Sequence, residues 1–97
     1  GGMPASALDG VARKVITDAG YGAAFSHSLG HGLGLHIHER PRVSALSKET
    51  LTPGSVVTIE PGVYIPGWGG VRIEDDILLT ATGCSVLTTA PRDLLVL

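Results

Sequence analysis

The run of residues 25–41 constrains the fold more than any other part of the chain. It carries glycines at positions 30, 32 and 34 together with all four histidines of the protein, which are His27, His31, His36 and His38. Each glycine in a helix interior costs about 1 kcal/mol relative to alanine, so three within five residues disfavour a helix. The run is therefore predicted to be an irregular strand that concentrates imidazole groups in one short segment.

The segment before this run is predicted to be an amphipathic helix over residues 7–19. Its apolar residues recur at three- and four-residue steps, as Leu8, Val11, Ala12, Val15, Ile16 and Ala19. Ser6 and Asp9 have the spacing of a capping box at the start, and Gly20 is a suitable stop at the end.

Three later segments have strand character, at residues 56–65, 71–80 and 84–89. Glycine- and proline-rich turns separate them, at residues 52–55, 66–70 and 81–83. One helix followed by about four antiparallel strands predicts an α+β fold in which the helix covers one face of a sheet.

Composition narrows the class of protein. The chain has 97 residues, enough for one domain, and its 43% hydrophobic and 16% charged residues describe a globular chain. A net charge of −2 without a clustered basic surface gives no reason to expect nucleic-acid binding, and no apolar stretch reaches the length of a membrane span. The single cysteine, Cys84, cannot form an internal disulfide. It is expected to be a small core residue of a cytoplasmic protein.

Two glutamates are expected to share one polar face of the sheet. Alternation along the strand directs Val57 and Ile59 toward the helix, and Thr58 and Glu60 away from it. Pairing with the next strand then brings Glu60 beside Glu74, both at the centre of buried strands. Adjacent carboxylates raise one another's pKa unless a positive charge neutralises them, and either Arg72 or a metal ion could serve.

Other interpretations of these motifs are weaker. His27, His31 and His38 would share one face of a helix, but the glycines argue against a helix, and no H-E-x-x-H motif is present. The glycine run lacks the lysine of a phosphate-binding loop. No G-x-S-x-G motif is present, and Cys84 has no nearby base, which disfavours nucleophilic catalysis. His36 has no clear partner and is expected to be exposed.

Two motifs resemble those of a known family. The first is H-S-L-G-H-G-L-G-L-H-I-H-E-R-P, similar to H-G-x-G-H-x-x-G-L-x-x-H-E, and the second is T-I-E-P-G-V-Y-I-P-G-W-G-G-V-R-I-E-D-D. Both resemble the pita-bread metallopeptidases, in the branch of aminopeptidase P (Xaa-Pro aminopeptidase) and prolidase. The resemblance covers nearly the whole chain and corresponds to the C-terminal half of the family's fold, an antiparallel curved sheet backed by a helix.

The resemblance implies a metal-dependent peptidase that hydrolyses the peptide bond next to proline. In that family two divalent ions, with manganese expected and cobalt or zinc possible, are held by two aspartates, one histidine and two glutamates. The matching metal ligands here are His31, Glu60 and Glu74. Glu60 would also shuttle protons, His38 would act in catalysis and bind substrate with His27, and Arg72 would hold the surrounding carboxylates and the substrate in place.

The sequence departs from the family pattern because it has no counterpart of the two aspartate ligands. Residues 1–97 are therefore expected to be a single partial domain, inactive alone, that forms a homodimer or associates with a missing N-terminal half. Two other functions remain open on the same fold. One is a non-catalytic module that binds peptides or proteins, and the other is a creatinase-like hydrolase without metal.

Overall fold

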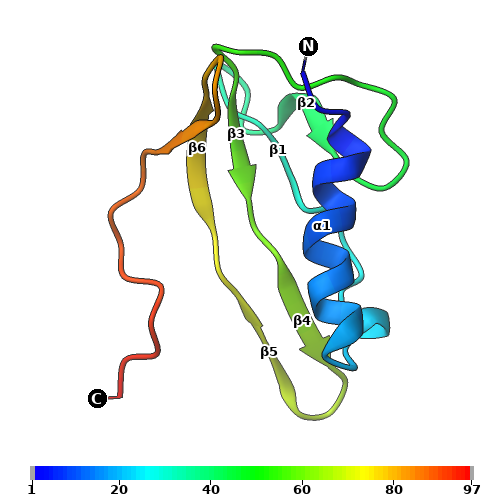
Figure 1. Cartoon of the computed structure of the whole chain (residues 1–97). Helices are drawn as coiled ribbons and strands as arrows, with labels where there is room; N and C mark the ends of the chain where they lie inside the picture. Colours follow the sequence, from blue (N-terminus) through cyan, green and yellow to red (C-terminus); the bar gives the residue numbers. More distant parts are fainter. Residues whose placement is uncertain (1, 97) are drawn as a thin grey trace.

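The computed structural model describes residues 2–96, which form one α-helix, one short 3₁₀ helix and seven strands (Figure 1). In chain order the elements are α1 (Ala5–Asp18), η1 (Gly22–Ala24), β1 (Gly30–Gly32), β2 (Glu39–Val43), β3 (Val56–Ile59), β4 (Gly62–Ile65), β5 (Gly69–Arg72), β6 (Asp75–Leu79) and β7 (Cys84–Val86). The expected α+β class and the expected helix are confirmed. The histidine run is irregular, as expected, with its glycines in and after the three-residue strand β1.

All of the paired strands are antiparallel. Five of them form one sheet in the order β2-β1-β3-β6-β7, while β4 and β5 form a separate two-stranded sheet. Figure 1 shows how the two sheets are connected: β3 continues toward β4, and β5 returns toward β6, so that the four strands make one long ribbon. The ribbon extends beyond the five-stranded sheet to the turn between β4 and β5.

The ribbon is interrupted where the sequence predicts two unbroken strands. Ile59 pairs with Asp75 on one side of the break, and Gly62 pairs with Arg72 on the other. The register is the same on both sides, so Glu60 lies opposite Glu74, as predicted. Their expected position at the centre of buried strands is wrong, because both lie in the break. Pro61 has no N–H to donate to the ladder, although its carbonyl accepts a hydrogen bond from the Ile73 N–H at 3.2 Å.

The helix packs on the β2 end of the sheet, and the core lies between them. The buried apolar residues are Ala5, Phe25, Leu29, Val43, Leu51, Val57 and Ile77, and Leu8, Ala12 and Ile16 of α1 pack against them. Val57 and Ile59 face this core, as expected. The predicted apolar stripe is only half right, because Val11 and Val15 lie on the outer face and are 59% and 66% exposed.

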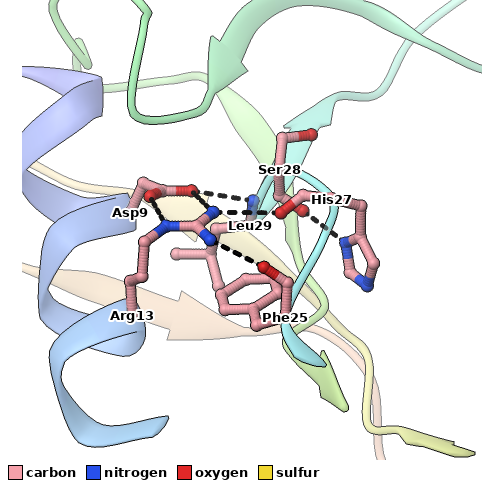
Figure 2. Close-up of polar contacts among 6 residues, drawn as sticks. All are labelled: Asp9, Arg13, Phe25, His27, Ser28 and Leu29. Carbon is pink, nitrogen blue, oxygen red and sulfur yellow. Dashed lines mark hydrogen bonds and ion pairs between the residues drawn. The ribbon is translucent and has the colours of Figure 1, made fainter. Parts of the chain in front are cut away.

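The two ends of α1 differ in how well the sequence predicts them. Gly20 adopts a φ of +94°, a conformation that favours glycine, and follows the last turn. The capping box is wrong: Pro4 occupies the cap position, and among residues 2–96 no side chain forms a hydrogen bond that caps the helix. Asp9 is instead fully buried and bound to Arg13, one turn further along α1 (Figure 2). An ion pair with a residue four positions away satisfies this carboxylate better than the helix end does.

Cys84 is exposed, contrary to the expected core position. It lies on β7, the edge strand that pairs only with β6 and whose three residues are all exposed. The helix lies at the opposite end of the sheet, so nothing covers β7 among residues 2–96. Beyond β7 the chain continues as an extended segment that leaves the sheet (Figure 1).

Within the described residues, none of the helices has both the length and the apolar character that crossing a bilayer requires.

Candidate metal centre

Three side chains from separate parts of the sheet converge at the break in the ribbon. They are His31 from β1, Glu60 from the segment after β3, and Glu74 from the segment before β6. Each offers a ligand atom that lies within 4.8 Å of the other two. His31 and Glu60 are the closest pair, with 3.1 Å between Nε2 and Oε1. The spatial convergence inferred from the sequence is therefore present.

The tautomer of His31 follows from its other ring nitrogen. Nδ1 lies 3.0 Å from the carbonyl oxygen of Gly32, and a carbonyl can only accept, so Nδ1 must carry the proton. In the neutral ring, Nε2 then presents a lone pair to the same space as the carboxylates of Glu60 and Glu74. A neutral imidazole nitrogen facing two carboxylates is an acceptor-rich group that suits a divalent cation.

Glu60 is held by a residue that the sequence patterns did not single out. The buried Thr58 hydroxyl donates to Glu60 Oε1 at 3.0 Å and accepts from the His31 backbone N–H at 3.0 Å. Thr58 thus links the backbone of one candidate ligand to the side chain of another. The signal was available in the sequence, because alternation places residues 58 and 60 on the same face of the strand.

Arg72 lies between the two glutamates but does not neutralise them fully. Its Nε is 3.7 Å from Glu60 Oε2 and 3.8 Å from Glu74 Oε2, distances too long for hydrogen bonds. The Arg72 side chain is half exposed, so its charge is screened by solvent. Arg72 and a metal ion are therefore compatible at this site, since the guanidinium leaves carboxylate oxygens available.

The remaining histidines occupy distinct positions. The His38 ring packs edge-on against the His31 ring, with 4.2 Å between their centroids, and His36 is exposed, as expected. The His27 ring packs edge-on against Phe25 and against Tyr64, which the sequence patterns did not single out. His27, His31 and His38 line one open groove of about 1020 Å³.

Gly62 keeps space open beside His27. A Cβ at Gly62 would lie 2.9 Å from His27 Nε2 and 2.8 Å from the Tyr64 hydroxyl oxygen, so a side chain there would displace both groups. The first residue of β4, just after the break in the ribbon, thus lies next to an imidazole. This arrangement leaves room for the ring.

The fold and the three converging side chains define a class: a helix-backed antiparallel sheet with a histidine and two carboxylates arranged for a divalent ion. The family model of "Metallopeptidase family M24" matches residues 1–81. The chain is also 55% identical over 94 residues to the Xaa-Pro dipeptidase of Pyrococcus furiosus, covering 97% of this chain and 27% of that protein. The chain belongs to metallopeptidase family M24.

Solved structures agree with this assignment. The Xaa-Pro dipeptidase from Bacillus anthracis superposes with a TM-score of 0.97 at 51% identity, covering 99% of this chain and 27% of that one. An X-prolyl aminopeptidase from Caenorhabditis elegans, described as a cytosolic enzyme with a di-nuclear active site, gives a TM-score of 0.68 at 35% identity, covering 79% of this chain and 13% of that one. The fold is that of the C-terminal half of a pita-bread domain. The chain spans about a quarter of the length of the curated relatives it matches.

Proposed function

We propose that this chain is part of a metal-dependent peptidase that hydrolyses the peptide bond next to proline, as an Xaa-Pro dipeptidase or Xaa-Pro aminopeptidase. The observation that carries the proposal is the convergence of His31, Glu60 and Glu74 within 4.8 Å in a member of a metallopeptidase family. Relatives such as the Pyrococcus furiosus protein, named Xaa-Pro dipeptidase, support the proline specificity. The substrate would be a peptide with proline at its second position.

In this proposal each side chain has a defined task. His31 Nε2 and the carboxylates of Glu60 and Glu74 hold the metal, which when bound lowers the pKa of water and polarises the scissile carbonyl. Glu60 moves the proton, and its hydrogen bond from Thr58 keeps the carboxylate aimed at the site. His27 and His38 contact the substrate from the groove wall. Arg72 orients the two glutamates and the substrate.

The proposed cofactor is a pair of divalent ions, with manganese preferred and cobalt or zinc as alternatives. One imidazole and two carboxylates form a borderline-to-hard ligand set, which suits manganese. A di-nuclear site, like the one ascribed to the nematode relative, would need two further ligands. The family's two aspartates have no counterpart among these residues, so we propose that residues 1–97 form a partial domain that binds one ion weakly and is inactive alone.

The same proposal includes a protein partner and a location. We infer that the chain forms a homodimer or associates with the part of the fold that carries the aspartates. The exposed Val11 and Val15 on the outer face of α1 support such a contact, since apolar side chains gathered on a surface favour association. A cytoplasmic location is supported by the cytosolic relative and by the free thiol of Cys84.

Calorimetric titration with manganese tests the metal site. We expect the wild-type chain to bind one ion and Glu74→Gln to weaken binding by about tenfold or more, because it removes a charged ligand. The matched control is Asp18→Asn, which removes an exposed carboxylate from α1 and should not change the affinity. Equal binding by the wild type and Glu74→Gln would remove Glu74 from the site. No binding by the wild type would favour the two metal-free alternatives, a binding module or a creatinase-like hydrolase.

A further inference from the structure

A buried ion pair on α1 contacts the chain immediately before the candidate metal ligand His31. Asp9 is fully buried, and Arg13 binds it through two hydrogen bonds, from Nε to Oδ2 at 2.9 Å and from Nη2 to Oδ1 at 3.1 Å. Asp9 Oδ1 also accepts from the Leu29 backbone N–H at 3.1 Å. The hydrogen bonds with Asp9 raise the pKa of Arg13. The Arg13 guanidinium is therefore held in its charged form, and the two-point contact with Asp9 fixes its geometry.

Arg13 extends the contact to two more backbone groups. Its Nη1 donates to the Phe25 carbonyl at 2.9 Å, and its Nη2 donates to the His27 carbonyl at 3.0 Å. The guanidinium carbon lies 4.2 Å from the centroid of the Phe25 ring. Figure 2 shows the result: Asp9 and Arg13 together hold the alternate residues 25, 27 and 29 of one segment.

The His27 ring is held in place by two neighbours from the same segment, Phe25 and Ser28. The ring packs edge-on against Phe25 at 5.1 Å, and Nδ1 donates to the neighbouring Ser28 carbonyl at 2.7 Å. Nδ1 therefore carries the proton in the neutral ring, and Nε2 presents a lone pair. In the part of the chain that the structure describes, Nε2 is shielded from solvent and has no hydrogen-bond partner. A buried acceptor without a partner calls for a donor. A Cβ at Gly62 would lie 2.9 Å from Nε2, so Nε2 faces the backbone at Gly62, and a donor from outside the chain reaches it only when this cover moves.

We propose that Asp9 and Arg13 are positioning residues, which fix the backbone of residues 25–29 so that His27 keeps Nε2 as an acceptor beside Gly62 and Tyr64, for a donor that enters when this cover moves. The identification of this donor as a peptide substrate rests on the proposed function. The fixed orientation of the His27 ring does not depend on that function. The planar guanidinium makes four hydrogen bonds at once, to both Asp9 oxygens and to the Phe25 and His27 carbonyls. A lysine at position 13 keeps the charge but cannot reproduce this geometry.

Nitrogen-15 NMR of the imidazole rings in the 97-residue chain tests the proposal with Arg13→Lys. The wild-type His27 should be a single tautomer protonated at Nδ1. In Arg13→Lys the Nε2-protonated form should become populated, and hydrogen exchange of the Leu29 amide should accelerate by roughly tenfold or more. Lys14→Gln is the matched control on the exposed face of α1 and should leave both signals at their wild-type values.

The proposal is overturned if folded Arg13→Lys keeps the wild-type His27 nitrogen shifts. The Asp9–Arg13 pair would then support the fold without setting the tautomer of His27. Circular dichroism establishes that the variant is folded. Should Arg13→Lys fail to fold, the same criterion applies to Asp9→Asn, which retains an oxygen that can accept from Leu29. In that variant we expect the same change in His27 with a smaller amplitude.

Zinc titration of the same samples separates this inference from the proposed function. Arg13→Lys should bind zinc within about twofold of the wild type, because neither Asp9 nor Arg13 contacts the three candidate ligands. If no protein binds zinc here or manganese in the calorimetric titration, while the His27 tautomer still changes, the metal-site proposal falls and the positioning role stands. If zinc binds and His27 does not respond, the positioning role falls alone.

Discussion

Two clusters of charged side chains in this molecule contrast in how their acceptors are satisfied. In the Asp9–Arg13 cluster, three hydrogen bonds reach the buried carboxylate, and the guanidinium donates to two further carbonyls. At the break in the ribbon, the lone pair of His31 and the carboxylates of Glu60 and Glu74 face one another. Their donors there are the Thr58 hydroxyl and the more distant Arg72.

The difference separates a structural ion pair from a site that needs an added cation. A buried charge with matched donors stabilises one arrangement of the chain and leaves no capacity for a ligand. A group of acceptors with too few donors repels itself, and that repulsion is relieved when a metal ion enters. Burial does not follow the same division. The Asp9 side chain is 0% exposed and the Glu74 side chain is 40% exposed, but Glu60 is only 14% exposed while Arg13 is 31% exposed. The number of donors, not burial, distinguishes the two clusters.

The largest expected effect on stability comes from breaking the Asp9–Arg13 cluster. Asp9→Ala removes the partner of Arg13 and the acceptor for Leu29, which should lower the free energy of unfolding by about 3 kcal/mol. Urea denaturation measures the change. The double variant Asp9→Leu with Arg13→Met should recover part of that loss, because no unpaired charge remains. A loss under about 1 kcal/mol for Asp9→Ala would remove the contrast between the two clusters.

An intermediate effect is expected at the link between the two candidate ligands. Thr58→Val preserves the shape of the side chain but leaves the His31 N–H without its acceptor and Glu60 without its donor. Stability should fall by about 1.5 kcal/mol, and manganese affinity should fall several-fold because Glu60 is less well oriented. Thermal unfolding and calorimetry measure the two changes. Thr82→Val, in an exposed bend before β7, is the control and should change neither quantity.

The smallest effect has the opposite sign. In the absence of metal, Glu74→Gln removes one of two facing carboxylates, so the free energy of unfolding should rise by about 0.5 kcal/mol. Saturating manganese should reverse the order, because only the wild type gains the full binding energy. Urea denaturation with a chelator and with excess manganese measures both cases. Destabilisation of the metal-free variant would mean that the Arg72 contacts outweigh the repulsion.

Much of this arrangement could be predicted from local sequence patterns. The helix followed from the spacing of Leu8, Ala12 and Ile16, and its end from Gly20. The position of Glu60 opposite Glu74 followed from strand alternation and one connecting turn. Two motifs were long enough to identify the family, and the match to family M24 confirms that identification. The roles of the site residues remain predictions.

Other features could not be predicted because they depend on neighbours that are distant in the sequence. Asp9 has a spacing that fits a helix cap, yet Leu29 and the segment around Phe25 decide that it is buried beside Arg13. Cys84 lies among apolar residues, yet its strand pairs on one side only. Val11 and Val15 belong to the apolar pattern of α1 but lie outside the contact with the sheet.

The amino-acid sequence by itself determined the helix, the antiparallel α+β class and which side chains carry donor atoms suited to a metal, because periodicity, turn residues and donor chemistry are local properties. Only the tertiary structure decided which acceptors are left without enough donors. That balance depends on where the ribbon breaks at Pro61 and on which strand lies beside it, and packing across the whole sheet determines both. The same packing supplied Asp9 with every donor it needs and left Glu60 and Glu74 facing His31.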